Sequence, residues 1–296
     1  MSDLLAQYQN GNLMTSLYSD GTRIRVTQDD EFNPAFAENV DVHISDRCDH
    51  LCPMCYAGCT PDGEFANLFD WKFLDSLHAG MEMALNLNFP IHPYIEQFLI
   101  LLKEKGIVAN VTVNQDHFEQ NQRVIKRLYD QGLIYGIGVS LVKATPQFID
   151  VAKTYPNLII HVINGVVTPM DLDLLKDHDL KLLILGYKDI GRGTTYQAKH
   201  KQTVEMNQAS LYYSLEVLIK HFKVVSFDNL ALEQLNVRRL LTDEEWEQFY
   251  GGDDGLFSFY INLVKGYFAK NSLSDVHWPI KVLTMDQMFE VVRKEV

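Results

Sequence analysis

Cysteine is scarce in this sequence and occurs in only one place. The chain has 296 residues and four cysteines, all of which lie within residues 48–59. A disulfide framework distributes its cysteines along a secreted chain, so this clustering argues against one. It fits the reducing interior of a cell, and we expect a cytoplasmic protein.

Long apolar runs and an excess of basic charge are also missing. No apolar run is long enough to cross a bilayer, and no basic segment followed by an apolar core opens the chain, so we expect neither a membrane span nor a secretory signal. Lysine and arginine number 26 against 39 acidic residues, a formal net charge of −13. Binding to nucleic acid normally needs a basic surface, so we do not expect an extended nucleic acid as a partner.

Strand and helix signals alternate from residue 40 onward. The expected strands are 40–45, 82–87, 108–114, 135–141, 158–163, 181–185 and 224–228. The expected helices are 71–80, 93–105, 116–131, 146–154, one opened by Thr168 as its N-cap, and 201–221. Such alternation predicts a parallel sheet with right-handed crossovers, in which site residues gather at the carboxyl ends of the strands.

The two ends of the chain differ from this α/β body. Residues 13–27 predict a β-hairpin around Asp20-Gly21, followed by a polar connector. After residue 228 we expect helices at 243–249, 257–270 and 285–295, the first with a capping box of Thr242 and Glu245. The expected organisation is an N-terminal hairpin and connector (1–39), an α/β body (40–228) and a C-terminal helical extension that packs on it (229–296).

Three of the cysteines, Cys48, Cys52 and Cys55, follow the spacing C-x3-C-x2-C directly after the strand at 40–45. Thiolates are soft ligands, suited to zinc or to the iron of iron–sulfur clusters. A four-cysteine zinc site with Cys59 in a non-enzymatic binding protein is one interpretation, although zinc sites usually draw ligands from two separate segments. A thiol-redox pair, Cys52 and Cys55, is another, but it leaves Cys48 without a role.

The cysteine spacing, set in alternating strands and helices, resembles the radical S-adenosylmethionine (SAM) superfamily. The resemblance implies a partial (βα)6-type TIM barrel, with a [4Fe–4S] cluster held by Cys48, Cys52 and Cys55 and with SAM on the fourth iron. It implies an enzyme that cleaves SAM reductively to a 5′-deoxyadenosyl radical, which abstracts hydrogen from a substrate. An electron donor such as flavodoxin or ferredoxin would supply the electron. Cys59 is expected to be a spare thiol.

The resemblance also implies where SAM would be bound. The aromatic residue usual before the third cysteine is replaced by Met54, and Tyr56 follows instead as a cofactor-binding candidate. Asn86 and Asn88 stand where the family has a glycine-rich segment at the end of the second strand. The polar residues that end the fourth and fifth strands, and would contact the ribose and carboxylate of SAM, are Ser140 and Asn164.

A glycine-rich loop at 186–193 follows the sixth expected strand. Glycine permits close backbone approach, and Lys188 and Arg192 could hold a carboxylate or phosphate of SAM or substrate. Asp228 and Asn229 are candidates for substrate contact. With the acidic composition, these residues favour a small anionic metabolite, nucleotide or peptide as substrate, but the sequence names no catalytic residue.

Overall fold

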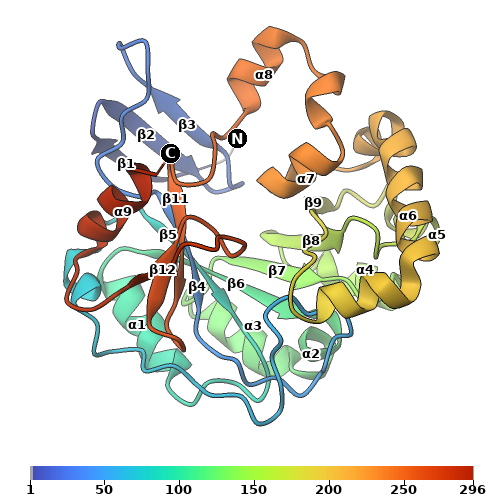
Figure 1. Ribbon diagram of the computed structural model, residues 1–296, viewed down its shortest axis with the longest axis horizontal. Coiled ribbons are helices and arrows are strands. Elements are labelled where there is room, and N and C mark those ends of the chain that lie inside the picture. The colour runs from blue at the N-terminus through green and yellow to red at the C-terminus, as the bar shows by residue number, and fades with distance from the viewer. Residues whose placement is uncertain (1–2, 296) are drawn as a thin grey trace.

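The computed structural model describes residues 3–295 and shows an α/β protein built on a large, mostly parallel sheet (Figure 1). Within those residues the sheet has ten strands in the order β10-β9-β8-β7-β6-β5-β4-β11-β12-β13. The described residues include no helix that is long and apolar enough to cross a membrane.

Seven strands of this sheet follow one another both in sequence and in space, each parallel to the next. They confirm the seven strands predicted between residues 40 and 228. Their bounds are β4 (Asn39–His43), β5 (Glu82–Asn86), β6 (Val108–Asn114), β7 (Gly136–Ser140), β8 (Leu158–Ile163), β9 (Lys181–Leu185) and β10 (Val224–Phe227).

The crossover segments form helices on the outside of the strands (Figure 1). These are α1 (Ile95–Glu104), α2 (Gln115–Gln120), α3 (Gln122–Asp130), α4 (Pro146–Ala152), α5 (Pro169–Leu175) and α6 (Arg192–Leu218), which continues into the short 3-10 helix η2 (Ile219–His221). The expected capping box at Thr168 is present. Three helices differ from the prediction: residues 71–80 form only a short 3-10 helix, η1 (Lys72–Ser76), the helix expected at 116–131 is divided at Asn121 into α2 and α3, and α6 begins nine residues earlier than residue 201.

The two faces of the parallel sheet differ in polarity. In β4, β5 and β6 alternate side chains such as Val42, Leu85 and Val111 are buried in a core shared with the outer helices. The other face is partly accessible and carries polar side chains, although parallel sheets are usually apolar on both faces. We call this the polar face of the sheet; its residues include Asp41, Asn86, Thr112, Asn114, Ser140 and His161.

The N-terminal segment forms a separate three-stranded antiparallel sheet of β1 (Leu4–Asn10), β2 (Leu13–Tyr18) and β3 (Arg23–Val26). The predicted hairpin is confirmed, and β1 is an additional strand. A buried carboxylate joins this sheet to the body: Glu38, with no exposed surface, pairs with Arg25 at 2.8 Å and accepts a hydrogen bond from Thr15 at 2.6 Å. A buried charge is tolerated only when it is paired in this way.

The C-terminal segment is not an all-helical extension. Residues 257–270 were predicted as a helix, but they form two antiparallel strands, β11 (Ser258–Asn262) and β12 (Tyr267–Ala269), and the short β13 (Trp278–Pro279) follows. β11 runs parallel to β4 and extends the sheet beyond it. Phe259, Leu263 and Tyr267 are spaced four residues apart, as on one face of a helix. However, a run of aromatic and β-branched residues that is buried on both faces is equally typical of a strand.

The helices expected elsewhere in this segment are present. α8 (Asp243–Phe249) has the capping box of Thr242 and Glu245, and α9 (Met285–Arg293) packs its buried Met288 and Phe289 into the core. Two further short elements, α7 (Asn229–Gln234) and the 3-10 helix η3 (Val237–Leu240), follow β10.

Candidate functional site

The cysteine loop, residues 44–71, leaves the carboxyl end of β4 and folds back on itself. The backbone N–H of Cys48 donates to the carbonyl of Thr60 at 2.8 Å, and that of Asp49 donates to the carbonyl of Phe89, beyond β5, at 3.0 Å. Cys48 and Cys59 are buried, Cys52 and Cys55 are half-buried, and all four are free thiols. The loop is therefore a fixed structure that presents its cysteines at the carboxyl end of the sheet.

Arg192, the first residue of α6, holds this loop through hydrogen bonds, although the two are far apart in the sequence. Its Nε donates to the carbonyl of Cys52 and its Nη1 to the carbonyl of Cys59, both at 2.9 Å, while its backbone N–H donates to the carbonyl of Cys55 at 3.1 Å. The preceding Gly191 has φ +56°, and a Cβ there would lie 2.3 Å from the carbonyl oxygen of Tyr56. Arg192, a candidate for anion binding, is thus a residue that positions the cysteines.

Cys52 has two polar neighbours beside its sulfur. The Nδ1 of His50 lies 3.1 Å from the Sγ of Cys52, and the Nε2 of His50 lies 2.6 Å from a carboxylate oxygen of Asp116. The Nδ2 of Asn114, at the end of β6, donates to the same sulfur at 3.6 Å. No spacing rule predicts the contact of His50 with Asp116, because the two residues are 66 positions apart and only the fold brings them together.

The four thiols influence one another electrostatically. Burial raises the pKa of Cys48, and burial together with the charges of Cys55 and Cys48 raises the pKa of Cys52 to about 11. A hydrogen bond from the Cys59 thiol lowers the pKa of Cys55 to about 5, and the same bond raises the pKa of Cys59. Cys48, Cys52 and Cys55 therefore face a common region, in which Cys55 is the thiol most readily ionised.

The spacing of these sulfurs can be compared with that around a single ion. Four thiolates at 2.3 Å around zinc lie about 3.8 Å apart. Among residues 3–295, the one set of three histidine, cysteine or carboxylate ligand atoms within 4.8 Å of one another is His43, Asp46 and Cys59. His43 and Asp46 are already hydrogen-bonded at 2.6 Å. Cys48, Cys52 and Cys55 do not form such a set, so at least one pair of their sulfur atoms lies more than 4.8 Å apart.

Asn86 and Asn88, the candidates at the end of β5, hold the start of the cysteine loop. The side chain of Asn86 accepts from the backbone N–H of Ile44 at 2.7 Å and donates to the carbonyl of Ser45 at 2.9 Å. Asn88 donates to the same carbonyl at 2.9 Å and to the sulfur of Cys59 at 3.6 Å. These amides therefore position the start of the cysteine loop.

The remaining candidates are distributed along the same edge. Lys188 and Tyr56 meet, with the Nζ of Lys188 4.2 Å from the centre of the Tyr56 ring. Ser140 is half-buried on β7. Asn164 is buried and donates to Gln234 of α7 at 3.0 Å, while its Oδ1 has no hydrogen-bond partner in the described part of the chain. The structure thus brings Tyr56, Lys188 and Arg192 to the cysteines and turns Asn164 toward α7.

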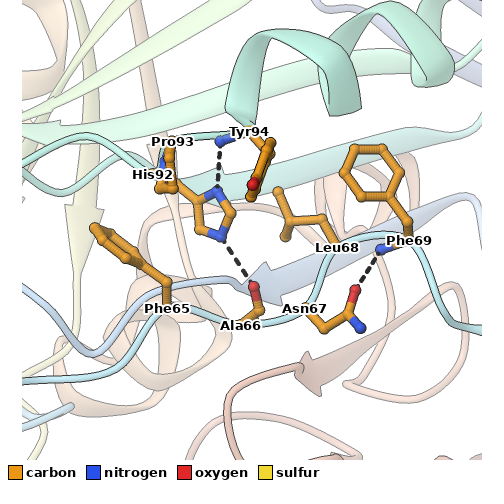
Figure 2. Close-up of a pocket in the computed structure, with 8 residues that line it drawn as sticks. All are labelled: Phe65, Ala66, Asn67, Leu68, Phe69, His92, Pro93 and Tyr94. Atoms are coloured by element: carbon orange, nitrogen blue, oxygen red, sulfur yellow. Dashed lines mark hydrogen bonds between the residues drawn. The ribbon is translucent and has the colours of Figure 1, made fainter.

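A pocket of about 470 Å³ lies between residues 65–69 and residues 92–94, which precede α1, and none of the four cysteines lines it (Figure 2). Figure 2 shows His92 at its wall, where Nε2 donates to the carbonyl of Ala66 at 2.9 Å and Nδ1 accepts from the backbone N–H of Tyr94 at 3.1 Å. Burial lowers the pKa of His92, in keeping with this neutral tautomer. The imidazole joins two backbone segments, and none of the candidate site residues lines the pocket.

Comparison of the sequence with protein-family models and with curated proteins finds no match.

Proposed function

We propose that this chain is a radical SAM enzyme and that its consecutive parallel strands form the wall of a partial (βα)6-type barrel. One observation carries the proposal: the C-x3-C-x2-C cysteines lie on a fixed loop at the carboxyl end of β4, the first of seven consecutive parallel strands. Active sites of α/β barrels lie at this end of the strands. The polar face of the sheet would then line the inside of the barrel.

The residues of the loop fit a [4Fe–4S] cluster. Cys48, Cys52 and Cys55 would ligate three irons. Burial raises the pKa of Cys48 and Cys52 and so favours their protonated thiols, and metal binding would displace these protons. Cys59 is engaged by Cys55, Asn88 and Ser45, which leaves one iron without a protein ligand. When bound there with SAM, such a cluster would supply the reductive cleavage that yields a 5′-deoxyadenosyl radical.

Several side chains of this chain would bind and orient the cofactor. The amide of Asn114 would donate to a ligating sulfur, a contact that tunes the reduction potential of a cluster. Arg192 would hold the loop rigid and place a positive charge beside the thiolates. Tyr56 and Ser140 would border SAM, whereas Asn164 is buried against Gln234 of α7 and would have to turn to reach it. A small-molecule or peptide substrate and an electron donor such as flavodoxin or ferredoxin remain the expected partners.

A thiol nucleophile is a second candidate, favoured by the chain of contacts Cys52–His50–Asp116. That geometry matches a cysteine activated by a histidine that a carboxylate orients. However, the thiolate is the reactive form, and the pKa of Cys52 is raised by burial to about 11. The arrangement therefore fits a sulfur held for metal binding better than a free nucleophile.

Anaerobic reconstitution with iron and sulfide tests the proposal. We expect a brown protein with broad visible absorption that retains about four irons and four sulfides per chain after desalting, as one [4Fe–4S] cluster requires. Zinc in place of iron, at one ion per chain and with no inorganic sulfide, would favour the binding-protein interpretation. A metal-free chain that reacts rapidly with iodoacetamide at Cys52 at neutral pH would favour the thiol nucleophile.

A further inference from the structure

Asp41 is an accessible carboxylate in the interior of the sheet. It lies on β4, which is flanked by β5 and β11, and it is directly paired with Ala84 and Tyr260 in the sheet register. Its side chain is nevertheless exposed, whereas its neighbours Val40 and Val42 are buried on the opposite face. Because Ala84 is small, the polar face is open beside this carboxylate.

One ammonium group stands among the carboxylates of this region. Lys188 donates to Ser272 at 2.7 Å and lies over the ring of Tyr56. Burial lowers its pKa, and three carboxylates raise it: Asp228, Asp41 and Asp254. Arg192 is also a cation, but its guanidinium is directed at the carbonyl groups of Cys52 and Cys59 in the cysteine loop.

The other charged and titratable groups near Asp41 do not offset this excess of negative charge. Asp254 accepts from the amides of Asn229 at 2.7 Å and Asn271 at 2.6 Å, which are neutral donors. His161 lies on β8 of the same face, but burial lowers its pKa to about 4, so it is neutral at pH 7. One lysine therefore faces three carboxylates. Burial raises the pKa of Asp41 and the charge of Lys188 lowers it, so a further positive charge beside Asp41 would favour its ionised form.

Aromatic rings also border Asp41. Tyr56 is 36% exposed and reaches this region from the cysteine loop. Tyr260 is buried and lies directly beside Asp41 in the sheet register, and the ring of Tyr56 faces the Nζ of Lys188 at 4.2 Å. A carboxylate combined with aromatic faces is the arrangement that recognises an ammonium group.

We propose that Asp41, Tyr56 and Tyr260, which we call the Asp41 site, bind a substrate through a positively charged amino group, with Asp41 as its ionic partner and Lys188 as the cation that competes for it. The inference rests on the proposed function, because it takes the polar face as the substrate side of a radical enzyme. It reverses the expectation of an anionic substrate, which rested on Lys188 and Arg192 before their partners were known. Tyr56, next to Cys55, would place the carbon skeleton of that substrate beside the cluster.

Three ligands of equal length but different charge test the Asp41 site. The full-length chain is titrated with pentane-1,5-diamine, pentane-1,5-diol and pentanedioate by calorimetry, each at low and at physiological salt. We expect the diamine to bind more tightly than the diol and the dianion to bind least. Asp41→Asn should weaken diamine binding by about tenfold or more, since it leaves the shape unchanged and removes the ionic partner.

Two further variants separate this site from general attraction to an acidic protein. Lys188→Met should tighten diamine binding, because it removes the competing cation, and Asp150→Asn, an equal charge change on the outer helix α4, should leave it unchanged. Equal effects of Asp41→Asn and Asp150→Asn, or tighter binding of the dianion, would overturn the inference.

The test of the Asp41 site does not depend on the iron–sulfur cluster, because binding of the diamine is measured both with and without reconstituted iron. A protein that binds the diamine at Asp41 and never cleaves SAM would refute the proposed function alone. A protein that cleaves SAM and binds the diamine no better than the diol would refute the Asp41 site alone.

Discussion

Replacing Cys48, Cys52 or Cys55 by alanine is expected to abolish assembly of the [4Fe–4S] cluster, whereas Cys59→Ala is expected to retain it. Three thiolates hold three irons, and the loss of one exposes the cluster to hydrolysis and loss of iron. Cys59 contacts Cys55, Asn88 and Ser45, and these contacts place it outside the set of ligands. Iron and sulfide content after anaerobic reconstitution measures the effect.

Cys59→Ala is the control for this series, since it removes a thiol from the same loop that is buried like that of Cys48. Near-equal metal loss in all four variants would indicate a four-cysteine site and would favour zinc. Full metal content in any of the first three variants would remove that cysteine from the ligand set. Circular dichroism of each variant distinguishes loss of ligand from loss of fold.

The second large effect is expected at Arg192. Arg192→Lys keeps the positive charge, but an ammonium cannot reproduce the planar fork that donates to the carbonyls of Cys52 and Cys59. Loss of these two charge-assisted bonds should destabilise the cysteine loop by about 2 to 4 kcal/mol. The free energy of unfolding, measured with a chemical denaturant, should fall by part of this amount, and the yield of reconstituted cluster should fall severalfold.

Arg123→Lys on α3 is the control for that substitution, because Arg123 is an exposed arginine. Its effect on the free energy of unfolding should stay within about 0.5 kcal/mol. If Arg192→Lys resembled this control in both stability and cluster yield, the contacts of Arg192 would not be what positions the cysteines.

Much of the fold could be predicted because the strands of a parallel sheet carry a local signal. Segments such as 108–114 and 158–163 combine β-branched residues with clear boundaries, and their ends were predicted to the residue. β1 lacked that signal, since its sequence LLAQYQN contains no β-branched residue. The strand β11 was mistaken for a helix because burial on both faces erases the period of two on which the prediction depends.

The candidate site was predictable only as far as it is local in sequence. The spacing of Cys48, Cys52 and Cys55 lies within one loop and could be recognised directly. The contacts of Arg192 join residues 133 and 140 positions apart, and no spacing rule indicates them. The electrostatic surroundings of Asp41 likewise depend on Lys188 and Asp254, which only the folded sheet brings near it.

The most direct test of the central claim is to add SAM to the reconstituted protein under strong reductant and without oxygen. An iron held open by the protein should bind SAM, so the EPR signal of the reduced cluster should change on addition of SAM. 5′-Deoxyadenosine and methionine should then accumulate in the wild-type protein and not in Cys52→Ala. A wild-type protein that holds the cluster but shows an unchanged signal and leaves SAM intact would contradict the account.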